Sequence, residues 1–374
     1  MADDSTIQRV ARLTALSAIL ALIEERVSAV APCECVLSPA QDRTLAEDVV
    51  SAERPPHPIA LRDGFAVEAA AFADASSYAP VPLTLVARRI DAGEPLPRGT
   101  DAVLPLDAVA LRGTTAEAIA AVSPGEGVLP AGGDAAPATP LHRAGQRLRA
   151  IDIAVMAASG IAKVSIRVPR IRIAIGGVAT SPPIQAAFEF LSYALVIAGA
   201  DGLASIGDRK SLEDGLMETN SDAVIAVGGT GSGRRDGAVQ TLARFGRVEA
   251  HGIAVAPGET AAFGFAGERP ILLIPGRLDA VLAVWLLIGR RLVAKLAGGS
   301  IEEIPALIPL KRKVTSTIGM TEVIPVSCAE GMAEPLGSGY LSFTSLARSD
   351  GWIVIPAESE GFAAGTPVAV NPWP

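Results

Sequence analysis

A glycine-rich stretch that follows an apolar run carries the clearest chemical signal in this sequence. The run Asp222–Val227 has the composition of a buried β-strand, and Gly228, Gly229, Gly231 and Gly233 follow it directly. Glycine permits positive φ and a close approach of backbone N–H groups to a ligand, and a helix after such a loop favours negative charge at its N-terminus. The pattern therefore predicts a loop that binds a phosphate-bearing ligand.

Two familiar phosphate-binding loops do not fit this stretch. No Lys-Ser or Lys-Thr follows the glycines, as a P-loop requires, and the spacing after Gly229 does not match the dinucleotide-binding fingerprint. The neighbouring Arg234 and Arg235 can meet a small anion. A tight strand-to-helix turn without any ligand stays open as the alternative.

The composition narrows the class of protein. The chain of 374 residues is long enough for about two to four domains. Its longest apolar run, residues 280–288, is about half of a membrane span, so no membrane insertion is expected. The net charge of −8 argues against nucleic acid as the main partner. The start Met-Ala-Asp-Asp has no secretory pattern, so the expected location is cytoplasmic.

The cysteines and histidines form no metal-binding pattern. Cys33 and Cys35 lie close together, but no second pair is near them, and the three histidines are scattered. Neither a zinc site nor a disulfide framework is expected, and Cys33 and Cys35 are expected to be structural.

Periodicity predicts the elements of the N-terminal part. Apolar residues at helical spacing predict one helix over residues 7–30 that opens the first domain, and prolines predict an extended chain over residues 33–67. Short β-like runs between Gly/Pro turns predict a small all-β module over residues 69–145. A helix over residues 151–159 that ends at Gly160 indicates that this module is inserted into the first domain.

From Pro169 onward, apolar strands alternate with helices, which is the pattern of a parallel sheet covered on both faces. Ligands of such sheets bind beyond the carboxyl ends of the strands, where the glycine loop is expected. The residues after about 300 return to strands and predict a β-rich C-terminal domain. The expected strands are 170–175, 222–227 and 270–274, and the expected helices are 184–197, 212–218, 238–245 and 278–296.

These elements give four expected domains. A helix–loop domain comprises residues 1–68 and 146–168, and the inserted β domain comprises residues 69–145. The α/β domain comprises residues 169–300, and the C-terminal β domain comprises residues 301–374.

Four separated segments resemble the MoeA/gephyrin type of molybdopterin molybdenumtransferase, in the order of that family. The first is Leu45–Val50 followed by Arg62–Val67, which is similar to the family's LAEDV and MDGYAV. The second, Ala92–Val103, is similar to TGAPLPxGADAVV. The third matches GGxSxGxxD over residues 228–236 and continues with residues 256–258 and 273–276. The fourth comprises residues 337–339 and 345–351.

The resemblance implies a MoeA-like multidomain α/β plus β fold. This fold has a three-layer α/β molybdopterin-binding domain, an inserted small β domain and a C-terminal β domain. The resemblance also implies a homodimer whose subunits together close the site, and a pterin phosphate as ligand, namely molybdopterin or adenylated molybdopterin. The implied reaction inserts molybdate into that cofactor with a divalent metal such as Mg²⁺, within molybdenum cofactor biosynthesis.

Matching positions receive candidate roles from this resemblance. Asp63, Asp208 and Asp134 are the candidate catalytic residues, and Asp208 is also the candidate metal ligand. The candidate cofactor-binding residues are Gly228, Gly229, Gly231, Ser232, Gly233, Asp236, Pro257, Gly258, Pro275, Gly276 and Arg277.

Several positions depart from the family pattern. Ala92 replaces the threonine of TGAPLP, Gly133 replaces the glutamate of GED, and Ala179 stands where TGDEL has an acid. Ala256 and Glu259 replace the lysines of KPGKP, a change that exchanges attraction of a phosphate for repulsion at the glutamate. The family's PGNP becomes Pro-Gly-Arg277-Leu278, and Arg277, together with Arg234 and Arg235, would restore the positive charge.

Two main function classes follow. The retained Asp63 and Asp208 favour an active molybdenum insertase. The missing acids favour the alternative, a non-catalytic molybdopterin-binding carrier or scaffold for a molybdoenzyme. A generic nucleotide-binding protein is a third interpretation, and the flanking β domains in family order count against it.

Overall fold

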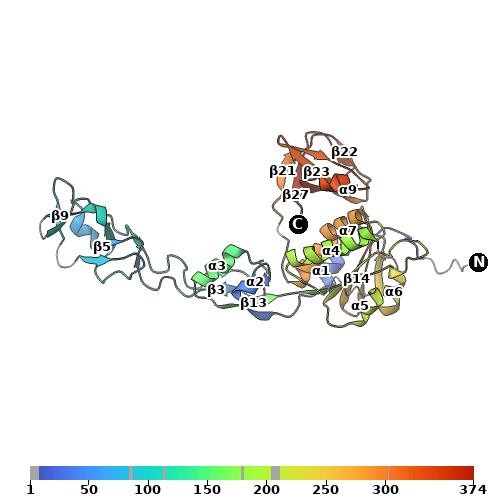
Figure 1. The fold of residues 1–374 in the computed structure, drawn as a ribbon, viewed down its shortest axis with the longest axis horizontal. Helices are drawn as coiled ribbons and strands as arrows, with labels where there is room; N and C mark the ends of the chain where they lie inside the picture. The colour runs from blue at the N-terminus through green and yellow to red at the C-terminus, as the bar shows by residue number, and fades with distance from the viewer. Residues whose placement is uncertain (1–7, 84–86, 113–114, 178–180, 204–210, 302) are drawn as a thin grey trace, which may run out of the picture.

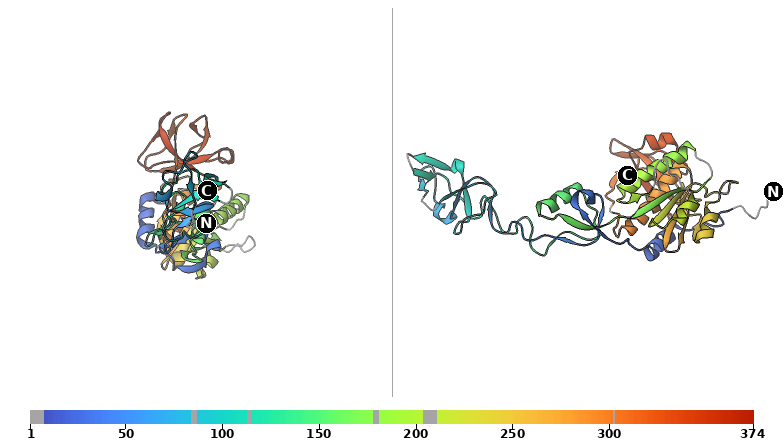
Figure 2. Two further views of the ribbon diagram at one scale, coloured as in Figure 1. Left: turned by 90° about the vertical axis from the view of Figure 1, so that its left-hand side faces the viewer. Right: turned by 60° about the horizontal axis from the view of Figure 1, so that its bottom comes forward.

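The structure, a computed structural model, describes residues 8–83, 87–112, 115–177, 181–203, 211–301 and 303–374. The molecule is elongated (Figures 1 and 2). The α/β domain and the C-terminal β domain lie at one end, and the inserted β domain lies at the other. The multidomain α/β plus β fold expected from the sequence is confirmed.

A six-stranded sheet forms the centre of the α/β domain. Four neighbouring strands are parallel, and three of them were predicted. The short parallel strand at one edge and the two antiparallel strands at the other edge were not predicted. The spatial order is β15 (Asp201–Gly202), β14 (Arg170–Ile175), β16 (Ala223–Val227), β20 (Arg269–Ile274), β19 (Ala262–Ala266) and β17 (Arg247–His251).

Helices cover both faces of this sheet, because its strands are apolar on both sides. Ile173 and Ile225 face one helix layer, while Ala174 and Val224 face the other. The first layer consists of α1 (Leu16–Arg26), α4 (Pro182–Ile197), α7 (Leu278–Val284), a π-helical turn (Trp285–Gly289) and α8 (Arg290–Leu296). The second consists of α5 (Leu212–Met217) and α6 (Ala238–Phe245).

The N-terminal helix differs from the prediction. α1 is shorter than the expected helix over residues 7–30, because Thr14 forms a bridge with Ile253 and exchanges backbone hydrogen bonds there. Ile19 and Ile23 pack into the core of the α/β domain, so α1 does not open the helix–loop domain. Helical spacing indicates that a helix has an apolar face, but it does not indicate which surface that face covers.

The helix–loop domain lies between the two ends of the molecule (Figure 1). Its α3 ends at Ala158, two residues before Gly160, which has a φ of +79° and was predicted as the helix end. A single helical turn, α2, contains Pro39 and interrupts the stretch expected to be extended. The elements are β1 (Cys33–Val36), α2 (Leu37–Ala40), β2 (Thr44–Leu45), β3 (Val49–Val50), β12 (Pro140–His142), α3 (Ala150–Ala158) and β13 (Lys163–Arg167).

The inserted β domain has its own small core around Phe72, Val67 and Leu104. The chain runs out to this domain and back from it (Figure 2). Its strands are β4 (Ile59–Ala60), β5 (Gly64–Val67), β6 (Val81–Pro82), β7 (Arg88–Ile90), β8 (Ala102–Pro105), β9 (Val109–Arg112), β10 (Thr115–Ala118) and β11 (Val128–Leu129), with single 3₁₀ turns at Ala69–Phe72 and Leu106–Ala108.

The C-terminal domain is attached to the α/β domain through a shared sheet. β18 (Val255–Ala256), which belongs to the α/β part of the chain, pairs in parallel with β23. The elements of the C-terminal domain are β21 (Ala306–Pro309), β22 (Val314–Thr315), β23 (Thr321–Ala329), β24 (Met332–Pro335), α9 (Phe343–Ala347), β25 (Gly351–Ile355), β26 (Gly361–Phe362) and β27 (Pro367–Pro372). In the described part of the chain, no helix has the length and apolar character needed to cross a bilayer.

Candidate functional site

Three glycine turns meet at the carboxyl ends of β14, β16 and β20. A Cβ built on Gly229 would lie 2.2 Å from the carbonyl oxygen of Gly176, and one built on Gly176 would lie 2.2 Å from that of Gly228. A Cβ on Gly276 would lie 3.3 Å from the Cα of Gly228, and Gly177 lies beside the same turn. The backbones of three strand ends are therefore in direct contact, at the edge where parallel sheets bind ligands.

Glycine is required at the four positions of the loop for two different structural reasons. Gly228 and Gly229 adopt positive φ, +88° and +73°, as the sequence analysis expected. Gly231 and Gly233 do not adopt it, and a Cβ on them would instead lie 2.7 and 2.9 Å from Oδ2 of Asp236. That oxygen accepts the N–H of Gly233 at 2.9 Å. Asp236, predicted to bind the cofactor, thus holds the loop in shape through one of its oxygens.

A glutamine that the sequence analysis did not identify closes the other side of the loop. Gln8 Nε2 donates to the carbonyl oxygens of Gly229 and Gly231, at 2.7 Å each. Its Oε1 accepts the N–H of Val239, in the first turn of α6, at 3.2 Å. No sequence signal marks Gln8, because its partners lie more than two hundred residues away along the chain.

Thr230 ties the loop to two neighbouring segments. His251 Nε2 donates to the carbonyl oxygen of Thr230 at 2.9 Å, since a carbonyl can only accept. The hydroxyl of Thr230 lies 3.1 Å from that of Thr260. Thr230 is itself buried, with 1% of its surface exposed. The glycine loop is therefore fixed to β17 and to the loop after β18.

The loop after β18 holds two more predicted cofactor-binding residues, Pro257 and Gly258, and both are buried. Gly258 has a φ of +134°, and a Cβ on it would lie 2.7 Å from Cγ2 of Val284 in α7. Gly258 therefore lets this loop pack on the helix. Glu259 is exposed, and its carboxylate accepts the N–H of Gly258 at 3.1 Å.

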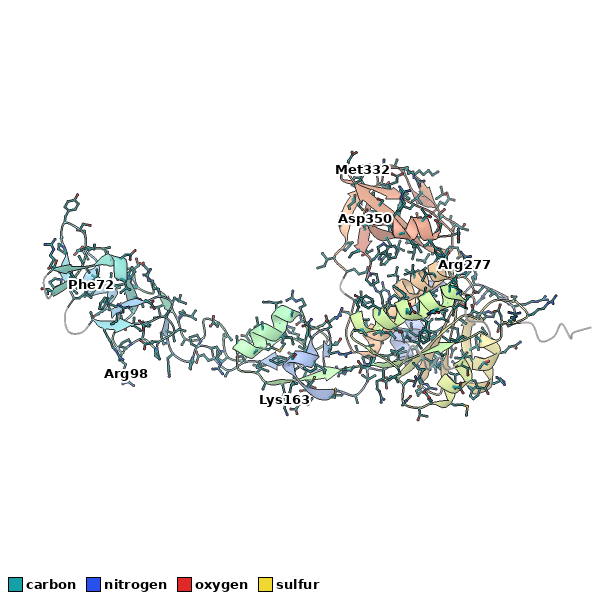
Figure 3. The ribbon with its side chains drawn as sticks, viewed as in Figure 1. Phe72, Arg98, Lys163, Arg277, Met332 and Asp350 are labelled. Carbon is teal, nitrogen blue, oxygen red and sulfur yellow. The ribbon has the colours of Figure 1, made fainter. Side chains whose placement is uncertain are left out.

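Arg277 lies where the α/β and C-terminal domains meet (Figure 3). It follows the half-buried Pro275 and Gly276 and donates to Asp279 from Nε at 3.2 Å and from Nη2 at 3.0 Å. This hydrogen bonding raises the pKa of Arg277 above its usual value. Its guanidinium carbon lies 4.5 Å from the ring centre of Tyr340. The side chain is 61% exposed, so Asp279 orients a cation that solvent and ligands can reach.

Two of the predicted acids, Asp63 and Asp134, do not join this cluster within one chain. Asp63 is exposed in the inserted β domain, where it accepts the N–H of Ala92 at 2.8 Å. Asp134 is exposed between β11 and β12, and its N–H donates to the carbonyl of Arg54. The β domain and the α/β sheet lie at opposite ends of the molecule (Figure 1). Asp208 and Ala179 lie outside the described residues.

Ser232 is the remaining predicted cofactor-binding residue, and it lies on the open side of the loop. Ser232 is exposed at its tip, beside the exposed Arg234 and Arg235. Ala92 and Gly133, where family acids or hydroxyls are replaced, are exposed near Asp63 and Asp134, and Ala256 is buried. Within the described ranges, no group of three or more His, Cys, Asp or Glu side chains could hold a metal ion.

Comparison with known families follows the domain order of the structure. The model "MoeA N-terminal region (domain I and II)" matches residues 13–160, "Probable molybdopterin binding domain" matches 201–295, and "MoeA C-terminal region (domain IV)" matches 308–373. The glycine loop lies within the second match. This chain belongs to the MoeA family, as its sequence motifs predicted.

Similar solved structures share the fold over nearly the whole chain. The molybdopterin biosynthesis moeA protein from Pyrococcus horikoshii OT3 superposes with a TM-score of 0.79 at 23% identity, over 97% of this chain and 100% of that one. A structure of a molybdopterin biosynthesis moea protein from "Pyrococcus horikosii" gives a TM-score of 0.74 at 25% identity, over 96% of this chain and 99% of that one.

Curated relatives match over shorter stretches. "Molybdopterin molybdenumtransferase 1" of Mycobacterium tuberculosis is 27% identical over 224 residues, 55% of this chain and 52% of its own. A protein of Methanocaldococcus jannaschii, named as a "putative molybdopterin biosynthesis protein", is 32% identical over 165 residues, 43% of this chain and 38% of its own. The alignments thus span about half of these relatives or less.

Proposed function

We propose that this protein binds molybdopterin, in free or adenylated form, through its phosphate at the junction of the three glycine turns. The observation that carries the proposal is the contact of bare backbone at three adjacent strand ends, which leaves room for backbone N–H groups to approach an anion. Membership of the MoeA family supports a role in molybdenum cofactor biosynthesis.

Arg277 is the cation that completes this phosphate site. Asp279 fixes its orientation, and its planar guanidinium suits bidentate binding of a phosphate. Arg234 and Arg235 add exposed positive charge at the loop tip. These three arginines compensate for Ala256 and Glu259, which stand where the family pattern has lysines.

A second copy of the chain supplies the acids that one chain holds too far away. Large apolar side chains are exposed on α3, α4 and the segment before β21, where Ile151 is 58%, Val196 59% and Ile304 92% exposed. Parts of the same segments line a cavity of about 740 Å³ between the helix–loop, α/β and C-terminal domains. An apolar surface of this kind marks an interface, and the proposed partner is a second copy of this chain, which gives a homodimer.

In the homodimer, Asp63 and Asp134 of one subunit face the glycine turns of the other. The insertion of molybdate then takes place there with a divalent metal such as Mg²⁺, for which Asp208 is the proposed ligand. The same protein then hands the cofactor to a molybdoenzyme.

Binding and chemistry are tested on one preparation. Calorimetry with adenylated molybdopterin should show binding that weakens as salt concentration rises, because phosphate and arginine attract each other. AMP release with Mg²⁺ and molybdate, followed by chromatography, should fall to the background rate in Asp63→Asn. Binding without AMP release in the wild type would establish a carrier instead of an insertase. Absence of binding would overturn the proposal.

A further inference from the structure

All three carbonyl groups at the centre of the glycine loop are held by side chains. Gln8 Nε2 binds those of Gly229 and Gly231, and His251 Nε2 binds that of Thr230. Gln8 is buried, with 7% of its surface exposed. Only one orientation of its amide suits these contacts, because Nε2 must donate to both carbonyls while Oε1 accepts from Val239. The directions of three consecutive peptide planes are therefore fixed.

Because the peptide group is planar, these contacts of the carbonyls also fix the directions of the N–H groups that follow them. In a trans peptide, the C=O of one residue and the N–H of the next point in opposite directions. With the carbonyls of Gly229 and Gly231 directed at Gln8, the N–H groups of Thr230 and Ser232 both point away from Gln8. Among the described residues, neither N–H has a hydrogen-bond acceptor.

The first N–H groups of α6 are not available to bind an anion. The N–H of Ala238 donates to the carbonyl of Gly229 at 3.0 Å, and that of Val239 donates to Gln8 Oε1. The sequence predicts that the dipole of this helix favours the ligand's charge. In the structure the first N–H groups of the helix are already used, so the N–H groups of the loop itself remain for a ligand.

We infer that Gln8 is a positioning residue, which holds the glycine loop so that the N–H groups of Thr230 and Ser232 face the ligand's phosphate. This inference rests on the proposed binding of molybdopterin at the loop. Without Gln8, the carbonyl of Gly231 keeps no partner among the described residues, and that of Gly229 keeps only the N–H of Ala238. The peptide planes after both glycines are then less restrained, because glycine accepts both signs of φ. A rotated plane presents a carbonyl oxygen to the phosphate in place of an N–H, and that exchange is repulsive.

Two variants separate the contacts of Gln8. Gln8→Met has a similar length and makes none of the three hydrogen bonds. Gln8→Glu keeps an acceptor for Val239 but places carboxylate oxygens against both carbonyls. Gln41→Met is the matched control, because the side chain of Gln41 is exposed and, among the described residues, has only a long contact of 3.4 Å with Asp42.

The decisive measurement compares two ligands, molybdopterin and the same pterin after removal of its phosphate. Gln8→Met and Gln8→Glu should bind molybdopterin about tenfold or more weakly, because two backbone donors are lost, while their affinity for the dephosphorylated pterin stays unchanged. Gln41→Met should match the wild type with both ligands. Equal losses for both ligands, or no loss for molybdopterin, would overturn the inference.

Hydrogen exchange of the ligand-free protein tests the loop without relying on the proposed ligand. The segment 228–240 should exchange faster in Gln8→Met than in the wild type, and unchanged exchange would overturn the inference. If the wild type binds no molybdopterin but exchange still accelerates, the proposed function fails and the control of the loop by Gln8 stands.

Discussion

At the scale of single residues, Gly229 has no space for a side chain. On sequence grounds alone, Gly229→Val is expected to remove binding and to leave stability nearly intact. The structure changes this expectation, because even a methyl group would meet the Gly176 carbonyl at 2.2 Å and the φ is positive. The substitution therefore disturbs the fold as well as the ligand site.

We expect Gly229→Ala to destabilise the α/β domain by about 2 to 4 kcal/mol, from the backbone conformation and the clash together. Gly237→Ala, in the same loop, should change stability by less than about 0.5 kcal/mol, because no atom lies within 4 Å of its Cβ position. Urea unfolding of both variants, followed by tryptophan fluorescence, checks the prediction. Equal stabilities would contradict it.

The sequence predicted some residues of the site and not others, for a physical reason. The glycines and Arg277 follow strands directly, so local pattern and the resemblance were enough to predict where they lie. Gln8, His251 and Asp279 act through contacts that only the folded chain creates. Short-range patterns contain no information about such contacts. The roles assigned to Asp63, Asp134 and Asp208 stay predictions.

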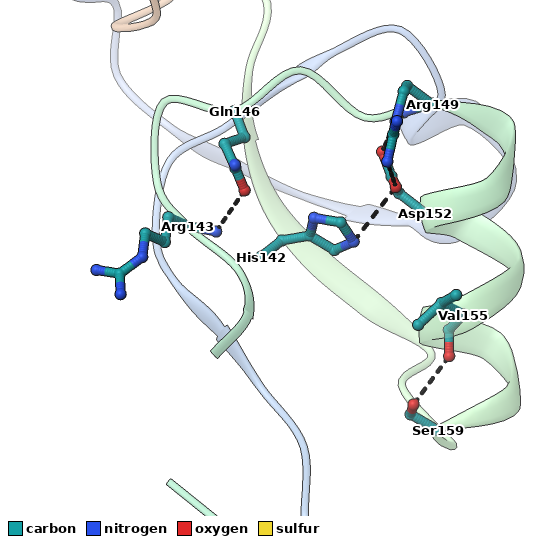
Figure 4. A network of polar contacts seen from close by, with 7 residues as sticks. All are labelled: His142, Arg143, Gln146, Arg149, Asp152, Val155 and Ser159. Carbon is teal, nitrogen blue, oxygen red and sulfur yellow. Dashed lines mark hydrogen bonds and ion pairs between the residues drawn. The ribbon is translucent and has the colours of Figure 1, made fainter. Parts of the chain in front are cut away.

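At the scale of elements, the start of α3 is capped by the buried carboxylate of Asp152, in its first turn (Figure 4). Asp152 Oδ2 accepts a hydrogen bond from the backbone N–H of Arg149 at 2.8 Å. Asp152 Oδ1 accepts one from Nη2 of the Arg149 guanidinium, also at 2.8 Å, and lies 3.5 Å from His142 Nε2. The hydrogen bond from the Arg149 side chain is the main cause that lowers the pKa of Asp152. Its ionised form therefore stabilises the start of the helix.

The sign of the pH dependence follows from this lowered pKa. A carboxyl with a pKa below its unfolded value of about 3.9 contributes stability above that pH and loses it as the pH falls through the folded value. Asp152→Asn should therefore weaken α3 by about 1 kcal/mol at pH 7, with little difference from the wild type in strong acid. Hydrogen exchange of α3 measures this, with the exposed Asp107→Asn as control. If the difference in the stability of α3 persists in strong acid, the ionised carboxylate of Asp152 is not its cause.

The junction between α7 and the C-terminal domain rests on a second buried carboxylate. Asp279, 2% exposed, binds the guanidinium of Arg277 and accepts the N–H of Leu341 at 3.3 Å. Asp279→Ala should cost about 2 to 4 kcal/mol of local stability, because both donors lose a buried partner. Residues 336–346 should then be cut faster in limited proteolysis, whereas Asp279→Asn, which keeps one acceptor, should lie between. Unchanged cleavage would show that the junction holds without Asp279.

Elements whose limits depend only on local sequence features were predicted well. The limits of α6 agree with the sequence prediction, since its apolar face and flanking glycines are local. The two antiparallel strands β17 and β19 were missed, because their pairing depends on the sheet edge beside β20. The helix expected over residues 278–296 contains a π-helical turn, where a Cβ on Gly289 would lie 2.5 Å from the ring of Trp285.

At the scale of the whole molecule, the proposed homodimer depends on the apolar surface around α3, α4 and Ile304. Light scattering should give twice the chain mass of 38.2 kDa. Val196→Glu should give a monomer, because it places a charge on the exposed apolar side of α4. Met217→Glu, 67% exposed at the end of α5 in the other helix layer, is the control and should remain dimeric. A monomeric wild type would remove the basis for a shared site.

The distance between Asp63 and the glycine turns also has a genetic consequence. In the proposed dimer, each site combines the glycine turns of one chain with the inserted β domain of the other. A cell that carries one allele defective in the turns and another defective at Asp63 would assemble mixed dimers, in which one site inherits both defects and the other inherits neither. Two inactive alleles would then restore each other in part, which two defects within one self-contained subunit would not do.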